Sequence, residues 1–518
     1  MTRSIPWLHR FGRRSFLRRA AVGTAGLAVL GCGSDEGPVV ELTHPLIVGS
    51  GFGGSVAALR FAEAGLGATV LERGRRWELG EFCSMREADE RAAWFSRQTH
   101  VGISVPVRRY AGLIEKFAGD HIDAMLPAAV GGGSLVYAGM MVRPPRDLFE
   151  SVFGGEVSYD AMQETWYPRV AEELPMGTIP SDVLESDAYG ATRIFLAQAE
   201  AAGLTPELNL NTIDWERVRL ELSGELPAEA SVGDYIYGLN SGAKGQVDRT
   251  YLARAEASGL VDVRPLHQVT GVAADPGGGY RVRVERIDEW GEVLERSTFR
   301  APALVLAAGS VHTTRLLVEA RARGDLPDLD ASVGQGWGHN GQHIHMRNDL
   351  GLEVGAYQGG PPAAVIRDLD NPVAPVTVEH GAAAFGYDCG CLICPSSSLN
   401  DGLGRLVWDA ASESTALEWD PANGRTGVDA GEAVSRRLNE ANGGVIAPLI
   451  GRTRTSTFHP LGGVVMGRAA DTFGRVHGYD GLYVVDGALI GGSTPTANPA
   501  WTIAALAERC LDTIVGDF

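Results

Sequence analysis

The sequence predicts an α/β protein whose main domain is a doubly wound, Rossmann-type nucleotide-binding domain that is discontinuous in the chain. The first observation is a strand, a glycine-rich turn, a helix and a second strand in succession at residues 44–72. The second is a buried apolar run that ends in Gly309 and leads into a helix, within residues 303–322. The third is a short apolar strand at 481–486 followed by a closing helix at 501–515. These units favour parallel crossovers in one sheet, and the long gaps between them indicate a second domain threaded through the first.

The composition excludes several classes of protein. The 518-residue chain is long enough for roughly three domains of about 150 residues, so its core needs no metal or disulfide staples. Hydrophobic residues make up 44% and charged residues 21%, as in ordinary globular proteins, and the 68 glycines show no collagen-like period. A net charge of −19 disfavours a broad surface for nucleic acid phosphates. We therefore expect a folded protein without a nucleic acid partner.

The N-terminus is predicted to be an export signal. The first 31 residues carry six arginines and no acidic residue, and the apolar stretch at 20–30 is too short to span a bilayer as a helix. The pair Arg13-Arg14 favours the twin-arginine route, with a general secretory signal as the alternative. Val29-Leu-Gly-Cys32 is similar to a lipobox, so Cys32 is predicted to carry a lipid that tethers the protein to a membrane. The alternative is an ordinary cysteine beside a cleavage site, in a periplasmic or secreted protein.

The first strand–helix–strand unit carries the strongest nucleotide signal. Gly49-Ser-Gly-Phe-Gly-Gly54 fits the pattern G-x-G-x-x-G directly after an apolar strand. Glycines in this context permit a tight turn, close approach of the backbone to a pyrophosphate, and close helix packing. Glu72 ends the second strand, 23 residues after Gly49, where a carboxylate can accept ribose hydroxyls. The unit predicts a dinucleotide and leaves NAD and FAD both open. Its predicted cofactor-binding residues are Gly49, Gly51, Phe52, Gly53, Gly54 and Glu72.

The remaining elements divide between the two domains. A helix-like stretch after Gln246 leads into a strand at 260–264, and residues 280–285 alternate at period two, which is typical of an exposed-face strand. Residues 81–239 are of mixed character, and residues 331–455 are predicted to be irregular. The predicted boundaries are 1–31 for the export signal, 32–41 for a linker, 42–80, 240–330 and 456–518 for the nucleotide-binding domain, and 81–239 with 331–455 for the substrate-binding domain.

Several further segments carry motifs that occur in one family in the same order. The two most specific are Phe458-His-Pro-Leu-Gly-Gly463 and Tyr483-Val-Val-Asp-Gly487, the latter followed by Asn498-Pro499. The other segments are Ala129–Val136 (AVGGGSLV), Asn240–Leu252, Ala308–Ser310 and Gly334–Gly341. Together they resemble the glucose-methanol-choline (GMC) oxidoreductase family, and within it the bacterial cholesterol oxidases, over nearly all of the chain after the export signal. Tyr137 departs from the pattern, because it stands where the steroid-oxidising members carry Asn.

The resemblance implies FAD as the cofactor and an α+β protein in which an FAD-binding domain of Rossmann type is joined to a sheet-based substrate domain. The flavin is then expected to lie where the two domains meet. Asp486 is expected to contact the ribityl or phosphate region through its backbone or a water. The cofactor-binding residues implied by the resemblance are Gly131, Gly132, Gly133, Ser134, Val269, Ala308, Gly309, Asp486, Asn498 and Pro499.

The resemblance also implies a catalytic pair, and the chemistry of alcohol oxidation agrees with it. A group must accept or orient the hydroxyl proton while the carbinol hydride leaves for the flavin, and the pKa of histidine suits this near neutrality. His459 is predicted for this role, and Asn498 is predicted to position the same oxygen. Cholesterol oxidases also use a glutamate during isomerisation of a steroid double bond. Glu379 is the best match in this chain, with a solvated strand carboxylate as the alternative.

The predicted function is transfer of hydride from an alcohol on an apolar molecule, foremost a sterol, to FAD, with oxygen as the electron acceptor. One alternative is a dehydrogenase that passes electrons to a quinone or a redox protein. A second is a redox-silent lyase or isomerase of the same fold, and a third is a lipid-binding surface protein without enzymatic activity. Oxygen consumption and bleaching of the flavin by substrate distinguish these alternatives.

Three other features of the sequence leave their roles open. The cluster Cys389, Cys391 and Cys394 fits a metal site, a disulfide in an oxidising compartment, or buried structural thiols. The histidines in Gly338-His-Asn-Gly-Gln-His-Ile-His345 lack a carboxylate or cysteine flank, so no metal is predicted and they are interpreted as structural residues near the flavin. Attachment of FAD through His121, shortly before the second glycine loop, is an alternative to non-covalent binding.

Overall fold

A computed structural model describes residues 37–518 of the chain, apart from 96, 101–102, 384 and 449–454. The predicted export signal, with Arg13, Arg14 and Cys32, lies outside the described residues. Among the residues that are described, no helix combines the length and apolarity needed to cross a membrane. Val39–Glu41, predicted as the end of a linker, forms strand β1 and pairs in parallel with β12 (Val293–Ala301).

A five-stranded parallel sheet organises the nucleotide-binding part of the protein. Every neighbouring pair in it is parallel, and Leu46 lies opposite both Thr69 and Leu304. Four of its strands are buried and almost wholly apolar, as the sequence predicted for a sheet covered on both faces. The edge strand Val261–Arg264 reads Val-Asp-Val-Arg and is only partly buried. The doubly wound, discontinuous fold is therefore confirmed. In spatial order the strands are β23 (Leu482–Val484), β13 (Leu304–Leu306), β2 (Leu46–Val48), β3 (Ala68–Leu71) and β9 (Val261–Arg264).

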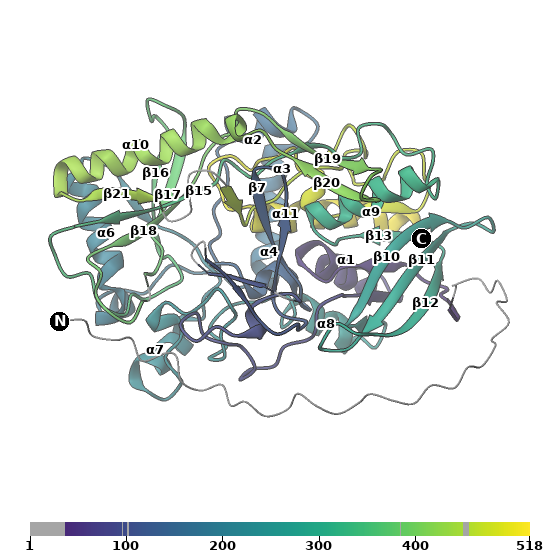
Figure 1. The fold of residues 1–518 in the computed structure, drawn as a ribbon, viewed down its shortest axis with the longest axis horizontal. Helices are drawn as coiled ribbons and strands as arrows, with labels where there is room; N and C mark the ends of the chain where they lie inside the picture. The colour runs from purple at the N-terminus through teal and green to yellow at the C-terminus, as the bar shows by residue number, and fades with distance from the viewer. Residues whose placement is uncertain (1–36, 96, 101–102, 384, 449–454) are drawn as a thin grey trace, which may run out of the picture. The chain divides into compact units, whose positions relative to one another are not determined.

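Helices and a second sheet cover this parallel sheet. Helix α1 (Phe52–Glu63) packs against α8 (Tyr251–Ala257) and α11 (Pro499–Ile514), and α9 (Ser310–Arg323) packs against β10 (His267–Ala274). All four helices lie on the same side of the molecule as the β10–β12 ribbon, at the right of Figure 1. The helices predicted within residues 44–72 and 303–322 and at 501–515 correspond to α1, α9 and α11. Strand β11 (Tyr280–Ile287) completes a four-stranded sheet in the order β1-β12-β11-β10.

A six-stranded sheet forms the other half, at the left of Figure 1, with α10 (Arg425–Asn442) and α6 (Gly190–Ala201) packed on it. Its strands, in spatial order, are β21 (Val445–Pro448), β15 (His343–Asn348), β18 (Leu392–Ser397), β17 (Val376–Glu379), β16 (Ala364–Asp368) and β8 (Pro206–Leu208). The smaller sheets contain β14 (Gln335–Trp337), β19 (Gly404–Asp409) and β20 (Ser414–Glu418); β22 (Thr455–Thr457), β7 (Ile122–Pro127) and β6 (Ile114–Ala118); and β4 (Arg97–His100) with β5 (Ile103–Pro106). The remaining helices are α2 (Arg146–Phe153), α3 (Tyr159–Ala161), α4 (Tyr167–Glu173), α5 (Ser181–Leu184) and α7 (Trp215–Ser223).

The prediction that residues 331–455 are irregular is wrong, because this segment contains most of the six-stranded sheet and the longest α-helix of the described residues. The sequence did carry a signal for α10, since Ala430, Val434 and Leu438 recur at intervals of four and are all buried. Strand β15 gave no such signal, because its buried positions are polar: His345 and Arg347 are fully inaccessible to solvent.

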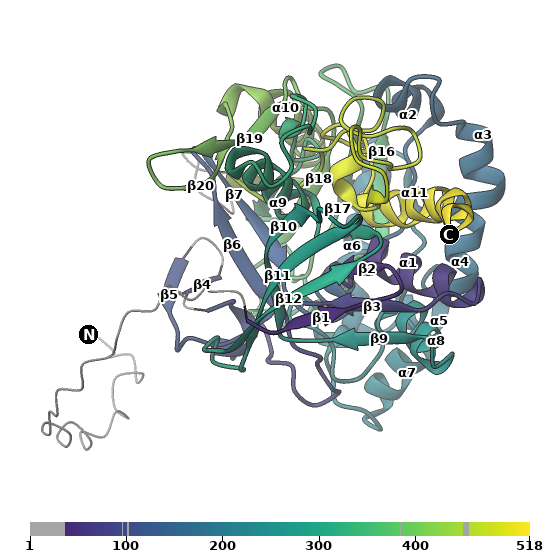
Figure 2. The ribbon, with the colours of Figure 1, turned by 90° about the vertical axis from the view of Figure 1, so that its right-hand side faces the viewer.

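Residues 149–170 contribute several side chains to the core of the parallel sheet. Phe149, Phe153, Tyr167 and Val170 are buried in the same apolar cluster as the central parallel strands. The sequence grouped this stretch with the substrate-binding segments, and the predicted domain boundaries stay predictions. Helix α4 packs against α11, and Figures 1 and 2 both show these two helices side by side.

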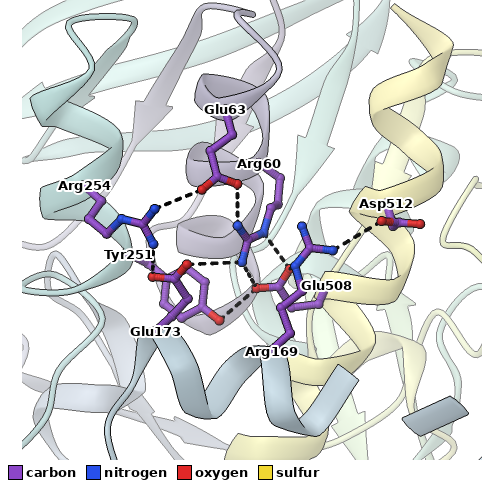
Figure 3. A network of polar contacts seen from close by, with 8 residues as sticks. All are labelled: Arg60, Glu63, Arg169, Glu173, Tyr251, Arg254, Glu508 and Asp512. Atoms are coloured by element: carbon purple, nitrogen blue, oxygen red, sulfur yellow. Dashed lines mark hydrogen bonds and ion pairs between the residues drawn. The ribbon is translucent and has the colours of Figure 1, made fainter. Parts of the chain in front are cut away.

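A buried ion-pair network ties the helices of this half together (Figure 3). Glu508 on α11 is inaccessible to solvent and accepts two hydrogen bonds from Arg60 on α1, each 2.7 Å long. Tyr251 on α8 donates a third hydrogen bond of 2.8 Å to the same carboxylate, and Arg169 on α4 approaches to 3.2 Å. One carboxylate therefore joins four helices around the core. Glu63, Glu173, Arg254 and Asp512 extend the network to the surface.

Removing this carboxylate should destabilise the fold. In Glu508→Ala the Arg60 guanidinium, which is 7% exposed, loses its main counter-charge in the interior. The free energy of unfolding, measured by urea titration, is expected to fall by about 3–5 kcal/mol. Glu150→Ala is the control, because Glu150 pairs with Arg146 on the solvent side of α2, where both side chains are half exposed. It should leave the unfolding midpoint unchanged, and an equally stable Glu508→Ala protein would contradict the prediction.

Candidate active site

A cavity of about 1020 Å³ connects the ends of the parallel strands with the six-stranded sheet. Its wall at one end consists of the two glycine-rich loops, the end of β3 and the residues that follow β13 and β23. Its wall at the other end includes Glu379 at the end of β17, His459 and Asn498. The sequence predicted that residues from distant segments would meet here, and the structure brings them into one cavity.

The first glycine turn is shaped by close contacts between main chains. Gly49 has a φ of +97°, and a Cβ atom there would overlap the carbonyl of Ala307 in the neighbouring strand. A Cβ atom on Gly53 would overlap the carbonyl oxygen of Val485, and one on Gly54 would overlap that of Gly49. Glycine is therefore required at these positions for helix α1 to approach the sheet, as the nucleotide-binding pattern predicted.

The two glycine loops touch each other. A Cβ atom on Gly132, which has a φ of +52°, would lie 2.7 Å from the Cα atom of Gly51. Helix α1 begins after Gly51, and because glycine has no side chain, no side-chain group caps the start of the helix. The first N–H groups of the helix therefore remain open to an anionic ligand.

Most of the predicted cofactor-binding residues line the cavity. The lining members are Gly49, Gly51, Phe52, Gly53, Glu72, Gly132, Gly133, Val269, Ala308, Gly309, Asp486, Asn498 and Pro499. Gly54, Gly131 and Ser134 lie behind the wall. The hydroxyl of Ser134 donates to the carbonyl of Gly131 and accepts from the N–H of Val247. Ser134 therefore supports the second glycine loop from behind.

Two buried carboxylates hold the backbone of the nucleotide end. Glu72 accepts hydrogen bonds from the N–H and hydroxyl of Ser50 and from the N–H of Gly74, and burial raises its pKa. Asp486 accepts from the N–H of Gly309 at 2.8 Å and from the hydroxyl of Thr313 at 2.6 Å, and burial raises its pKa to about 6. The Asp486 side chain is thus used to fix the loop around Gly309. Its contact with a cofactor through backbone or water stays a prediction.

Gly53→Ala should abolish cofactor binding. The new methyl group overlaps the Val485 carbonyl, so helix α1 must move away from the sheet and carry the first glycine turn with it. Overpacking of this kind costs about 1–3 kcal/mol in stability as well. Gly516→Ala is a matched control, because no atom lies within 4 Å of its Cβ position. The measurement is the FAD content of the purified protein after equilibration with excess FAD, and full occupancy in Gly53→Ala would contradict the prediction.

At the reaction end, Asn498 and Glu379 are in direct contact. Asn498 Nδ2 donates a 2.9 Å hydrogen bond to Glu379 Oε1. Glu379 is 5% exposed, and burial raises its pKa to about 7, against the lowering effect of the Asn498 hydrogen bond. Asn498 Oδ1 is buried and has no hydrogen-bond partner among the described residues. The alternative that Glu379 is a solvated strand carboxylate is therefore wrong, since it lies in the cavity wall.

His459 is oriented by Asn340, a residue to which the sequence analysis assigned no role. The N–H of Thr494 donates to Asn340 Oδ1 at 2.8 Å, which identifies the oxygen of this amide. Asn340 Nδ2 therefore faces the carbonyl of Ala497 at 2.8 Å and His459 Nδ1 at 3.3 Å. Because Nδ1 accepts this hydrogen bond, the proton of the neutral ring resides on Nε2. Burial lowers the pKa of His459 to about 4, so the ring is neutral at pH 7.

The wall around these residues is mostly apolar. Ile236, Ile344, Phe385 and Ile393 line this part of the cavity, with Phe458 next to His459. Tyr137 also lines the cavity, but its hydroxyl is turned to the protein: it donates to the carbonyl of Gly245 at 2.7 Å and is hydrogen bonded to Thr212. The reaction end thus combines a few polar groups with a large apolar surface, which is typical of a site for an apolar molecule.

The cysteines, and the histidines that the sequence left open, are held by other contacts. Cys389 and Cys391 form a disulfide, and Cys83, Cys394 and Cys510 are buried free thiols. His339 bonds to Asn400 and His345 to Ser435, so their rings point to different partners. Within the part of the chain that the structure describes, no three His, Cys, Asp or Glu side chains are grouped as metal ligands would be. His121 is exposed in the turn between β6 and β7 and does not line the cavity.

Comparisons with known proteins agree with the motifs. Residues 407–507 match the family model described as GMC oxidoreductase. The chain is 25% identical to a cholesterol oxidase of Acinetobacter baumannii, over 90% of this chain and 94% of that protein, and 27% identical to one of Mycobacterium tuberculosis, over 90% and 89%. The structure superposes on that of a fungal aryl-alcohol oxidase with a TM-score of 0.62 at 14% identity, covering 92% of this chain and 99% of that chain. The resemblance predicted from the motifs is thus confirmed: this chain is similar to GMC oxidoreductases over most of its length, and its residues 407–507 match the model of that family.

Proposed function

We propose that the protein is an FAD-dependent alcohol oxidoreductase that acts on an apolar alcohol, foremost a sterol. The observation that carries the proposal is the single cavity in which the glycine loops of a nucleotide site meet Glu379, His459 and Asn498. The similarity to cholesterol oxidases over most of the chain supports an alcohol as substrate. The apolar wall of the reaction end supports an apolar one.

The residues at the nucleotide end fit FAD. Gly309 has a φ of +82°, and its Cβ position has no atom within 4 Å, so the chain leaves open space beside this loop. The uncapped start of α1 offers N–H groups to a pyrophosphate, and Glu72 lies at the strand end where a ribose is held in this fold. We therefore assign the glycine loops, Glu72, Val269 and the loop around Gly309 to cofactor binding. FAD, when bound, supplies the acceptor for the hydride of the alcohol.

Different side chains at the reaction end orient the hydroxyl group and accept its proton. His459 donates its Nε2–H to the alcohol oxygen, because its Nδ1 is occupied by Asn340. It therefore orients the alcohol and does not take its proton in this tautomer. Glu379 is the carboxylate of the reaction end, and as an anion it can accept the hydroxyl proton while the hydride leaves. Asn498 holds Glu379 through its amide and stabilises the anion. In a steroid with a neighbouring double bond, the same carboxylate would carry the proton of the isomerisation.

The test is anaerobic mixing of the FAD-loaded protein with cholesterol, other sterols and a panel of simple alcohols. Bleaching of the visible flavin absorbance by a sterol is the expected result, because hydride transfer reduces the flavin. Bleaching only by small polar alcohols would overturn the sterol assignment and keep the alcohol oxidoreductase. Absence of bleaching by every alcohol would overturn the proposed reaction and favour a redox-silent enzyme of the same fold.

The electron acceptor and the location of the protein are part of the proposal. Admission of air to the reduced protein tests oxygen, since rapid recovery of the flavin colour identifies it as the acceptor, and slow recovery favours a quinone or a redox protein. We also propose export through the arginine-rich N-terminus and lipid attachment at Cys32. Cys32→Ser should release the protein from the membrane fraction of expressing cells, and unchanged fractionation would overturn the lipid anchor.

A further inference from the structure

The segment Asn240–Leu252 was singled out by its sequence, yet it contributes no side chain to the roles described above. Its central part, residues 244–248, lies behind the second glycine loop, residues 131–137. Tyr137 of the loop donates to the carbonyl of Gly245, and the N–H of Val247 donates to Ser134. These contacts bring the two segments together along several residues, and Lys244 makes the largest number of them.

Lys244 is a buried amino group surrounded by carbonyls. Burial lowers its pKa to about 7, and the three acceptors around Nζ match the three donors of its protonated form. It is 2% exposed, and its Nζ atom donates to the carbonyl oxygens of Leu135 at 2.6 Å, Tyr137 at 3.1 Å and Tyr235 at 2.7 Å. An ammonium group has three donors, so each one is used. No carboxylate of the described residues forms an ion pair with it. Its partners are therefore main-chain groups of two segments that do line the cavity.

The choice of lysine at this position is unusual for this chain. Of its 45 lysine and arginine residues only two, Lys116 and Lys244, are lysine. A planar guanidinium offers its donors in a rigid fork, whereas an ammonium group directs three donors from one point. Three carbonyls that converge on a single atom require the latter geometry. The three converging carbonyls therefore explain why this position has lysine in a protein whose other cations are almost all arginine.

Both tethered segments contribute to the lining of the cavity. Val136, Tyr137 and Ala138 line it from the glycine loop, and Tyr235, Ile236 and Tyr237 line it from the other segment. The same second segment also holds Met85 in the wall, because Asp234 accepts from the N–H of Met85 at 2.7 Å. One buried side chain therefore connects the loop on the cofactor side with the wall on the substrate side.

We propose that Lys244 is a positioning residue that ties the glycine loop at 131–137 to the Tyr235 wall and thereby sets how an alcohol is presented to the flavin. This inference rests on the proposed function, because it assumes that an alcohol reacts with a flavin in this cavity. Lys244 does not line the cavity, so it acts through Tyr137 and Tyr235 and not by contact with the substrate.

The test compares Lys244→Met with Arg425→Met. The first variant keeps the length of the side chain and removes its donors, and the second removes a cation that is 75% exposed on α10. Two properties of the FAD-loaded proteins are measured: the visible circular dichroism of the flavin, and the anaerobic rate of flavin reduction at increasing concentrations of the alcohol that reduces the wild type. In Lys244→Met the circular dichroism should change, and the rate at saturating alcohol should fall about 10²-fold with a smaller change in half-saturation. Arg425→Met should match the wild type in both.

A second variant keeps the test informative if Lys244→Met does not fold. Lys244→Arg keeps the charge and presents a planar fork, so its rate should lie between those of the wild type and Lys244→Met. Wild-type rates and circular dichroism in folded Lys244→Met would overturn the proposal, and so would failure of both variants to fold, which would make Lys244 a folding residue. If no alcohol reduces the wild type, the proposed function fails, while the circular dichroism of the same variants still decides whether Lys244 positions the cavity wall.

Discussion

Replacing His459 by alanine is expected to lower the rate of flavin reduction at saturating alcohol by about 10²- to 10³-fold, with FAD still bound. The ring is neutral at pH 7 because burial lowers its pKa to about 4, and its Nδ1 atom accepts from Asn340. In the proposed reaction, the single remaining N–H is therefore the donor that orients the alcohol oxygen. The measurement is stopped-flow reduction of the flavin under anaerobic conditions.

Two variants show whether orientation is the role of His459. Gln can present an N–H donor in place of Nε2–H but cannot act as a base near neutrality, so His459→Gln should be faster than His459→Ala. His477→Ala is the control, because His477 is exposed and lies outside the cavity wall. Equal rates for the wild type and His459→Ala would contradict the mechanism. Equal, low rates for both His459 variants would instead indicate that the ring removes the proton itself.

Replacing Glu379 by glutamine is expected to remove a pH dependence as well as most of the activity. Burial raises the pKa of this carboxyl group to about 7, so it is largely protonated below pH 7 and ionised above it. A base must be ionised to act, and the rate of proton removal should therefore rise with pH through about 7 and level off at higher pH. In Glu379→Gln this rise should disappear, and the proton-transfer step should be slower by about 10²- to 10⁴-fold.

The pH at which the rate rises provides a second check on the contact between Glu379 and Asn498. The Asn498 hydrogen bond lowers the pKa of Glu379, so in Asn498→Leu the rate should rise at a higher pH than in the wild type. Glu440→Gln on the exposed side of α10 should leave the profile unchanged. With a steroid substrate, the conjugated ketone product should be lost in Glu379→Gln while flavin reduction continues in part. A profile that keeps its rise near pH 7 in Glu379→Gln would assign that rise to another group.

Local patterns predicted the nucleotide half of the protein well. Leu46–Val48 and Leu304–Leu306 are runs of apolar residues, and the glycines at 49 and 309 follow them directly. Such strands are buried on both faces whatever surrounds them, so their signal is contained in a few consecutive residues. The six-stranded sheet was harder to predict because its strands mix buried polar and apolar residues. In β15, for example, Arg347 is buried by Gln198 and Asn439 on α6 and α10.

The sequence by itself determined the dinucleotide turn, the resemblance to GMC oxidoreductases, and the identity of His459, Asn498 and Glu379 as candidates. The motifs carry these because main-chain geometry and residue chemistry act over short stretches. Only the tertiary structure decided that Asn340 sets the tautomer of His459, that Asn498 donates to Glu379, and that Lys244 joins two walls of the cavity. The contacts of Asn340 with His459, of Asn498 with Glu379 and of Lys244 with Leu135 each join residues more than 100 positions apart in the chain, and their hydrogen-bond geometry depends on how distant segments of the fold are packed.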